Sequence, residues 1–564
     1  MSRPAINVAV ENLIEAGIDH VFGIPGGAAL LLYDALYEHK DEIRSVLARQ
    51  EGAAACMADM YGRLTGKPGV VIAQGAWMAS NAAFGILEAY LAGSPMLIIA
   101  DTSDYSGLSQ HGPWQNGAGE YGAFDLVGIM RSMSKYTTYA TNADELVHGI
   151  RLGIKHATTG RPGPACVIGR MNAFSGQVDP ETSNPKLYPI HGHINISPPC
   201  MCEADAEKIA DLLIAAEKPV MIAGRGIHSA WAHAELKELA ELLGMPVATS
   251  YMGKSAIVET HELALGTMGG IGQSVANHKI TGADVILAVG TCLAPENTKM
   301  LSPDFINPER QKIIQIDIEP LNAGWTFPVA LGVASEARQG LIMVIDAIKR
   351  KSPTIDVSGR IANVKELKDE LGFFRCNEFA SDESPIAPER IVHEVNQVVD
   401  KDTIICLDAG NNRQWFAKHF QTKAAGQIYA PGGVGGVGWG VPAALGAQIV
   451  LPDKKVIGLC GDGGMMMMLH CLETAKHYEV PVTYVVLNNS VLGNVRDFQA
   501  PERKISTSYP PPDLIAYAKA AGIEGIRIND PNSLGAALKQ SLNSAKPCLI
   551  EVITKEEQHF KLMN

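Results

Sequence analysis

The sequence has few charged and few aromatic residues, and its acidic residues outnumber its basic ones. Charged residues make up 19% of the 564 residues and aromatic residues 6%, whereas hydrophobic residues make up 46%. The 60 acidic and 47 basic side chains give a formal net charge of −13 at pH 7. Such a charge repels phosphate backbones and anionic lipids. We therefore expect neither nucleic acid nor a membrane surface as a partner.

The sequence also lacks the marks of secretion and of membrane insertion. Its ten cysteines are scattered through apolar segments instead of forming a dense framework, which is typical of free thiols in a reducing compartment. Glu11 and Glu15 interrupt the apolar stretch near the N-terminus, so we expect no signal peptide. No run approaches the roughly 18 apolar residues of a membrane span. These absences predict a cytoplasmic protein.

Short apolar runs alternate with helical periodicity in three successive segments, punctuated by 56 glycines and 32 prolines. This alternation predicts an α/β protein with three doubly wound parallel-sheet domains, at residues 1–185, 200–350 and 380–564. A proline-containing tract at 182–199 and a polar connector at 348–385 would join them. The runs that predict strands include 70–73, 96–100, 165–169, 220–223, 285–290, 313–318, 403–407, 456–459, 482–487 and 548–552.

Two polar motifs follow expected strands in the third segment. One strand leads into Gly461-Asp462-Gly463-Gly464 and the next leads into Asn488-Asn489. Neighbouring parallel strands end at the same sheet edge, so Asp462 and Asn489 are predicted to share one ion, and their oxygen atoms suit Mg²⁺. The glycines let backbone N–H groups approach phosphates at the start of a helix expected at 465–478. Either motif alone is more typical of a tight turn or polar loop, but together they predict a metal–diphosphate site.

These motifs resemble the diphosphate-binding signature of thiamin-diphosphate enzymes, GDG followed by NN. The resemblance extends over nearly the whole chain and is closest to the acetolactate synthase and pyruvate oxidase group. It implies a pyrimidine-binding domain, a central domain and a diphosphate domain in that order, with Asp462, Asn489 and the carbonyl oxygen of Val491 as ligands of Mg²⁺. The matching segments are 22–28, 49–55, 61–69, 160–164 and 432–442.

The resemblance assigns the central catalytic role to Glu51. In this family the corresponding glutamate hydrogen-bonds N1′ of the aminopyrimidine and favours the 4′-imino tautomer, which removes the proton from C2 of the thiazolium. An ordinary glutamate in the first turn of a helix, favoured by the helix dipole, is the alternative interpretation of the same residue. The surrounding motifs favour the catalytic role.

The resemblance also assigns other groups around the cofactor. Val437 would prop the cofactor in its V shape, although it is smaller than the methionine common in close relatives, and the backbone around Gly435 would accept a bond from the 4′-amino group. The remaining implied cofactor-binding residues are Asn81 in the pyrimidine pocket, Gly410 and Asn411 near the diphosphate, and Gly463 and Gly464 beside Asp462. The family assembles this site from two subunits, which implies a homodimer or a homotetramer.

The substrate side departs from the family pattern. Relatives usually have Gly-Pro-Gly where this chain has Ala76-Trp77-Met78. Trp77 would then roof the substrate pocket, unless it packs in a core as large aromatic residues more often do. Gln115 matches a glutamine near the thiazolium in acetolactate synthases and is a candidate catalytic residue. His111 is a candidate acid or base, although loop histidines are more often only solvated.

The central segment departs further. Acetolactate synthases have an Arg-Phe-Asp-Asp-Arg run that serves FAD and the second 2-oxo acid, and this chain has Cys292–Glu296 there, without either arginine. Gly224-Arg225-Gly226 follows a strand but lacks a third glycine at residue 229, so it is a weak dinucleotide motif. We therefore expect thiamin diphosphate and Mg²⁺ as cofactors and no FAD.

The function predicted from these residues is a thiamin-diphosphate-dependent carbon–carbon lyase or carboligase that acts on a 2-oxo acid or a related ketone, as in acetolactate synthase. Three alternatives remain within the cofactor class: a 2-hydroxyacyl-CoA lyase or oxalyl-CoA-type decarboxylase, a hydrolase of cyclic 1,2-diketones, and a non-catalytic paralogue that only binds cofactor. A nucleotide-dependent oxidoreductase is the alternative from another class, and it would need a complete glycine-rich motif in the central segment.

Overall fold

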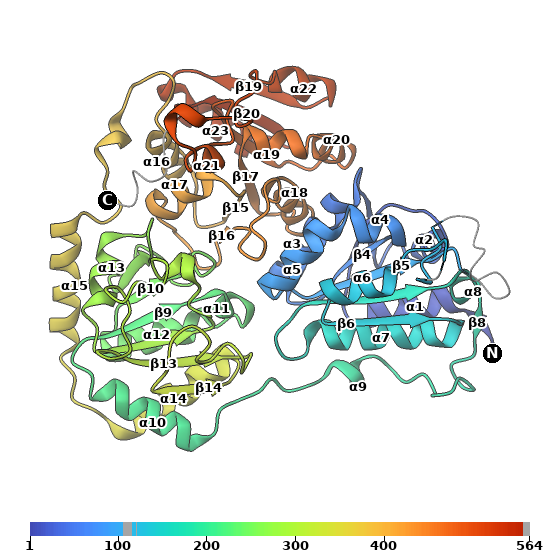
Figure 1. Ribbon diagram of the computed structural model, residues 1–564, viewed down its shortest axis with the longest axis horizontal. Coiled ribbons are helices and arrows are strands. Elements are labelled where there is room, and N and C mark those ends of the chain that lie inside the picture. The colour runs from blue at the N-terminus through green and yellow to red at the C-terminus, as the bar shows by residue number, and fades with distance from the viewer. Residues whose placement is uncertain (105–114, 120, 557–564) are drawn as a thin grey trace.

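The computed structural model describes residues 1–104, 115–119 and 121–556. Three α/β units follow one another along the chain, each built on a six-stranded sheet in which every strand pair is parallel (Figure 1). The first unit is blue to cyan, the central unit green to yellow, and the third unit orange to red. The three parallel-sheet units predicted from the sequence are therefore confirmed. No helix in the described residues is long and apolar enough to cross a bilayer.

The first unit has the strand order β3-β2-β4-β5-β7-β6. Its central strands are apolar and buried except at their last residues, because helices cover both faces of the sheet. The strands are β2 (His20–Gly23), β3 (Arg44–Leu47), β4 (Gly69–Gln74), β5 (Met96–Asp101), β6 (Tyr136–Ala140) and β7 (Pro164–Gly169), with a small antiparallel pair formed by β1 (Arg3–Pro4) and β8 (Gln177–Val178). The helices are α1 (Ala5–Glu15), α2 (Leu30–Glu38), α3 (Glu51–Thr65), α4 (Gly75–Ser80), α5 (Ala83–Ala92), α6 (Leu126–Met133), α7 (Ala143–Thr158) and α8 (Met171–Phe174).

The third unit repeats this topology, with the order β16-β15-β17-β18-β20-β19. Numbered within each unit, both sheets run 2-1-3-4-6-5. The strands are β15 (Thr403–Leu407), β16 (Ile428–Tyr429), β17 (Lys455–Gly461), β18 (Thr483–Asn488), β19 (Glu524–Ile528) and β20 (Cys548–Ile553). The helices are α16 (Pro388–Val398), α17 (Asn411–His419), α18 (Gly440–Val450), α19 (Asp462–Met467), α20 (His470–His477), α21 (Gly493–Arg496), α22 (Leu514–Ala520) and α23 (Pro531–Leu542).

The central unit has a different topology. Its order, β11-β10-β9-β12-β13-β14, runs 3-2-1-4-5-6 when numbered within the unit, which is the order of dinucleotide-binding folds. The strands are β9 (Pro219–Ala223), β10 (Val247–Thr249), β11 (Ala264–Thr267), β12 (Val285–Val289), β13 (Lys312–Asp317) and β14 (Leu331–Ala334). The helices are α10 (Glu203–Ile214), α11 (Arg225–Ser229), α12 (His233–Leu243), α13 (Ser274–Thr281) and α14 (Ala337–Lys351); short α9 (His191–Ile194) precedes them on the linker.

The first and third units share one hydrophobic core. Helix α3 of the first unit lies directly against helix α18 of the third, and one buried cluster includes side chains of both helices. At Gly446 the two helices approach so closely that a Cβ atom would lie 3.0 Å from the Cα atom of Met57. This contact fixes the relative position of the two sheets and of the loops at their carboxyl ends.

The connector expected at 348–385 is wrong in part, because it contains helix α15 (Val357–Leu371). Val364 and Leu367 are its two buried side chains and pack against the core of the central unit. Arg360 adds hydrogen bonds to the carbonyl oxygens of Leu243 and Ala216, near the ends of two helices of that unit. Two apolar positions give only a weak helical pattern in the sequence. Packing of these two side chains against the central unit is nevertheless enough to stabilise the helix.

The helix expected at 465–478 is also wrong, because the structure divides it into α19 and α20. The first helix begins earlier, at Asp462, and the chain leaves the helical region at Met468, where φ is −127° and ψ is 23°. The side chain of Met468 is buried and lies against Gly438. Packing between distant segments therefore interrupts a helix that local periodicity would continue.

Candidate functional site

The carboxyl ends of β17 and β18 lie side by side, because Gly461 of β17 pairs with Leu487 of β18. Asp462 follows β17 as the first residue of α19 and is 2% exposed. Its Oδ2 accepts a hydrogen bond from the backbone N–H of Ser490, at 2.9 Å. Beyond β18, the loop from Asn489 to Val491 is closed by a bond from the Val491 N–H to Asn489 Oδ1, at 3.3 Å. Asp462 and this loop are thus brought together at one sheet edge.

Burial raises the pKa of Asp462. A cation placed beside this carboxylate would reverse the effect, since it favours the ionised form. The three ligands predicted from the sequence, the side chains of Asp462 and Asn489 and the carbonyl group of Val491, offer only oxygen atoms, which are the donors that Mg²⁺ prefers.

Asp408 lies between this edge of the sheet and the glycine-rich loop 432–438. It directly follows β15 and is fully buried, and its Oδ1 accepts the backbone N–H groups of Gly438 at 2.8 Å and Gly440 at 3.0 Å. A Cβ atom at Gly464 would lie 2.0 Å from Asp408 Oδ2, so only glycine fits there. Burial raises the pKa of Asp408 to about 6.

The loop after β15 adds two of the predicted cofactor residues. Gly410 has a φ of 107°, a conformation that favours glycine, and precedes helix α17. Asn411 begins that helix and its Nδ2 donates to Asp497 Oδ2 at 2.9 Å. The other atom of this amide, Asn411 Oδ1, is buried and has no hydrogen-bond partner among the described residues. A buried acceptor of this kind fits a bound ligand or water.

Glu51 is the first residue of α3 in the first unit. The side chain of Gln50 caps this helix by accepting the Ala53 N–H at 3.0 Å. Glu51 is 8% exposed, and its Oε2 accepts a hydrogen bond from Asn81 Nδ2 at 2.9 Å. Trp77 lies one turn before Asn81 on α4 and is 46% exposed. The structure therefore gathers Glu51, Asn81 and Trp77 in one place.

Three family models match the chain in sequence order. They describe the N-terminal TPP binding domain of thiamine pyrophosphate enzymes over residues 5–119, the central domain over 206–344, and the C-terminal TPP binding domain over 408–552. The chain belongs to the thiamine pyrophosphate enzymes. Thiamine pyrophosphate is the same compound as thiamin diphosphate, and this family catalyses carbon–carbon bond cleavage and formation, so the predicted class of enzyme is confirmed.

Whole-chain relatives of this thiamine pyrophosphate enzyme agree with that assignment. It is 31% identical to a probable acetolactate synthase large subunit of Methanocaldococcus jannaschii, over 97% of this chain and 91% of the relative. It is 32% identical to the probable acetolactate synthase large subunit of Methanococcus aeolicus, over 95% and 89%. It is 30% identical to the acetolactate synthase isozyme 3 large subunit of Escherichia coli, over 96% and 92%.

Sequence reasoning missed two buried acids of this thiamine pyrophosphate enzyme. Asp408 accepts a hydrogen bond from the N–H of Gly438, at the end of the glycine-rich loop, and Glu88 on α5 accepts one from the N–H of Gly432, at its start. Both left a signal in the sequence. Asp408 is an acid directly after a strand, and Glu88 is the one charged residue of an otherwise apolar helix.

The substrate side is less completely described. Gln115 opens a short described stretch, with a left-handed φ of 50°. No hydrogen bond within the described part of the chain joins it to Glu51 or Asp462. His111, the candidate acid or base, lies outside the described residues. The position of Gln115 in the reaction thus stays a prediction.

A cavity between the three units lies at the carboxyl ends of the central strands. Its volume is about 230 Å³, and Arg225, Gly290 and Asp317 line it. Pockets for drug-sized ligands measure roughly 300–1,000 Å³, and a flavin dinucleotide is larger than such ligands. Arg225 turns toward the first unit, where it donates to Ser94 Oγ at 2.7 Å. The expected absence of FAD stays a prediction.

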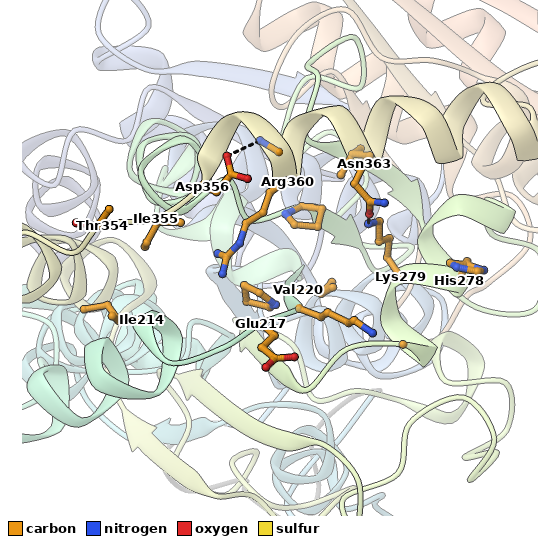
Figure 2. A pocket seen from close by; sticks show the side chains of 17 residues that line it. Ile214, Glu217, Val220, His278, Lys279, Thr354, Ile355, Asp356, Arg360 and Asn363 are labelled. Carbon is orange, nitrogen blue, oxygen red and sulfur yellow. Dashed lines mark hydrogen bonds between the residues drawn. The ribbon is translucent and has the colours of Figure 1, made fainter.

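A second cavity of the central unit, of about 740 Å³, lies under helix α15 (Figure 2). Figure 2 shows Arg360 and Asn363 of α15 on one side, Lys279 across from them, and Val220 at the start of the sheet. The cavity therefore lies at the edge opposite to the carboxyl ends of the strands. None of the predicted cofactor or catalytic residues lines it.

Proposed function

We propose that this enzyme is an acetolactate synthase-like carboligase, which takes a 2-oxo acid as donor and joins the fragment left after decarboxylation to a second carbonyl compound. When bound, thiamin diphosphate supplies the nucleophilic carbon and the electron sink for this chemistry. The printed names of the relatives support the choice of substrate class. The observation on which the proposal rests is the meeting of Asp462 with the loop Asn489–Val491 at one sheet edge.

In this proposal Asp462, Asn489 and the carbonyl oxygen of Val491 would hold Mg²⁺, which would supply positive charge for the diphosphate. The backbone of Gly463 and Gly464, where α19 begins, presents N–H groups to the anion. The orphaned Oδ1 of Asn411 would accept a hydrogen bond from a ligand or water there. Every one of these groups lies on a loop or in the first turn of a helix at the carboxyl end of the third sheet, where open α/β sheets bind their ligands.

Glu51 has the role of proton carrier at the pyrimidine ring. Asn81 holds Oε2 of this carboxylate, which fixes the orientation of the group and presents Oε1 for a bond to N1′. Glu51 is nearly buried, so water competes little for this oxygen. The carboxyl group thus moves a proton to and from the ring nitrogen, which is general acid–base catalysis at one defined atom.

We propose a homodimer or a homotetramer in which each site uses the first unit of one subunit and the third unit of another. Apolar side chains on the glycine-rich loop, at the end of α19 and just after α21 support this arrangement, because they are strongly exposed in the single chain. The exposed fractions are 46% for Val434, 39% for Val437, 54% for Met467 and 72% for Phe498. Pairing of two subunits would bury them.

We further propose that the enzyme works in the cytoplasm. All ten of its cysteines are free thiols, six of them buried, as in proteins of reducing compartments.

We also propose that it needs no flavin, because the cavity at the carboxyl ends of the central strands is too small for one. An absorbance scan of the purified protein between about 350 and 500 nm tests this: flavin bands would contradict the proposal.

Turnover assays test the proposed function. The protein is stripped of metal and cofactor by dialysis against EDTA, and pyruvate is added with and without thiamin diphosphate and Mg²⁺. We expect CO₂ and acetolactate only when both are present. Turnover of 2-hydroxyacyl-CoA or of cyclic 1,2-diketones, with no product from 2-oxo acids, would replace this function by one of its alternatives, and cofactor binding without any turnover would indicate a non-catalytic paralogue.

A further inference from the structure

One buried carboxylate of the first unit binds four consecutive backbone N–H groups of the third unit. Glu88 lies on α5 and is 1% exposed. Its Oε1 accepts the N–H groups of Gly432 at 2.9 Å and Gly433 at 3.0 Å. Its Oε2 accepts those of Val434 at 2.8 Å and Gly435 at 3.1 Å. An ionised carboxylate has about four acceptor positions, and the loop supplies two N–H groups to each oxygen of Glu88.

The glycines of the loop make this approach possible. A Cβ atom at Gly433 would lie 2.5 Å from the carbonyl oxygen of Glu88, and one at Gly436 would lie 2.0 Å from the ring of Phe84. Side chains at either position would push the loop away from α5. Gly433 and Gly436 are therefore needed for the close contact between the loop and α5.

Arg63 provides the opposite charge and extends the contact. Its guanidinium donates to Glu88 Oε1 at 2.8 Å, to Asp59 Oδ1 at 3.1 Å and to the carbonyl oxygen of Ala430 at 2.8 Å. It also lies over the ring of Trp439, 4.5 Å from the centroid. Ala430 and Trp439 flank the glycine-rich loop on either side. Arg63 therefore contacts both ends of this segment, and Glu88 binds the residues between them.

These contacts keep Glu88 ionised although it is buried. Burial by itself would raise its pKa, but the charge of Arg63 and the N–H groups of Gly433 and Gly432 outweigh burial and hold the pKa below its ordinary value. A buried charge is costly unless it is paired and fully hydrogen-bonded. The loop is consequently bound by a permanent anion at neutral pH.

The far side of the loop makes few contacts before the bond from the Gly438 N–H to Asp408. No atom of the described residues would lie within 4 Å of a Cβ atom at Gly435, where φ is 69°. Val437 is 39% exposed. These two residues are the ones assigned to the 4′-amino group and to the V-shaped cofactor. The cofactor-facing part of the loop thus depends on the contacts made by its opposite side.

We propose that Glu88 is a positioning residue, which fixes the loop 432–437 in its cofactor-binding conformation before the cofactor arrives. The proposal rests on the proposed function, since it takes Gly435 and Val437 as cofactor contacts. Glu88 acts through the loop, because its own carboxylate is buried between the first and third units. Its contribution is preorganisation. Because the loop is already ordered in the folded protein, no binding free energy is spent on ordering it when the cofactor binds.

Glu88→Gln tests the proposal, because it keeps the size of the side chain and replaces one acceptor oxygen by a donor. Glu259→Gln is the matched control. Glu259 is also fully buried, pairs with Lys254 and accepts the backbone N–H of Thr422 at 2.8 Å, so it also joins two units but does not touch the glycine loop.

The first measurement uses the cofactor-free protein. We expect hydrogen exchange of a peptide covering 431–438 to be roughly 10–100 times faster in Glu88→Gln, as for the loss of a charge-assisted hydrogen bond, and to be unchanged in Glu259→Gln. The second measurement is titration with thiamin diphosphate at saturating Mg²⁺, in which the Kd should rise at least about tenfold in Glu88→Gln only. A structural role alone would lower the melting temperature of both variants and leave these two quantities unchanged.

Unchanged loop exchange, or an unchanged Kd in a folded Glu88→Gln protein, would overturn the proposal. Should that variant not fold, Glu88→Asp replaces it: the charge opposite Arg63 is kept, but the shorter side chain cannot reach all four N–H groups, and the same two changes are expected. The proposed function fails in a different way, namely when the unchanged protein does not bind thiamin diphosphate at all.

Discussion

Asn81 Nδ2 donates a hydrogen bond to Oε2 of Glu51 at 2.9 Å, although the two residues are 30 positions apart in the chain. Glu51 begins helix α3, and Asn81 follows the short helix α4. The bond occupies one carboxylate oxygen and orients the other. A proton carrier needs such an orientation, because proton transfer depends on hydrogen-bond distance to the reacting atom.

Glu51→Gln should abolish activation of the cofactor while leaving its binding nearly intact. We expect exchange of the C2 proton of bound thiamin diphosphate for deuterium to slow by about 100-fold or more, the usual contribution of general acid–base catalysis. Quenched-flow NMR measures this rate. Asn81→Ala keeps the carboxylate but removes its hydrogen bond, so a smaller loss of about tenfold is expected. Exchange at the unchanged rate in Glu51→Gln would disprove the role of this residue.

Asp462→Asn should uncouple thiamin diphosphate from Mg²⁺. The amide removes the negative charge from the donor set, so we expect the Mg²⁺ concentration needed for half of the cofactor-induced rise in melting temperature to increase by about 100-fold. Scanning fluorimetry measures this midpoint. Asp453→Asn, an exposed acid in the turn before β17, is the control and should leave it unchanged. Equal midpoints in both variants would remove Asp462 from the metal site.

Trp77→Ala should change the choice of donor. The indole is half exposed one turn from Asn81, and its Nε1 is fixed by a bond to Gln74 Oε1 at 3.1 Å. If it roofs the pocket, its removal makes room, and the ratio of kcat/KM for a bulky 2-oxo acid to that for pyruvate should rise at least about tenfold. Trp231→Ala, at a tryptophan 51% exposed in the central unit, is the control. A lower melting temperature with an unaltered ratio would instead show that Trp77 only packs.

Asp408 should make stability depend on pH in a defined direction. Its folded-state pKa of about 6 lies above the unfolded value, so the folded protein retains a proton that the unfolded chain loses between about pH 4 and pH 6. The stability from this proton is complete below that window and is lost as the pH rises through it, by about 3 kcal/mol for two pKa units.

The comparison with Asp408→Asn isolates this effect. The melting temperature of the unchanged protein, relative to that of the variant, should decrease as the pH is raised from 4 to 6 and then stay constant up to pH 8. Scanning fluorimetry of both proteins over this range gives the difference. A difference that does not vary with pH would mean that Asp408 keeps an ordinary pKa in the folded protein.

Local patterns predicted the strands well and the helices less well. The apolar runs at 70–73 and 403–407 lie within the buried strands β4 and β15, because a parallel strand covered on both faces needs apolar residues throughout. The helix at 465–478 and the connector at 348–385 were wrong for opposite reasons. Met468 leaves the first helix to pack against Gly438, and α15 forms on only two buried side chains.

The amino-acid sequence by itself determined which segments become strands, which loops follow them, and which acids and amides stand at the ends of those strands, since these features depend on neighbours along the chain. Only the tertiary structure decided that Asp462 lies against Ser490 and that Glu88 binds the N–H groups of a loop 344 to 347 positions away. A buried carboxylate must find donors wherever folding places them, and its partners are set by packing between units, which periodicity along the chain does not encode.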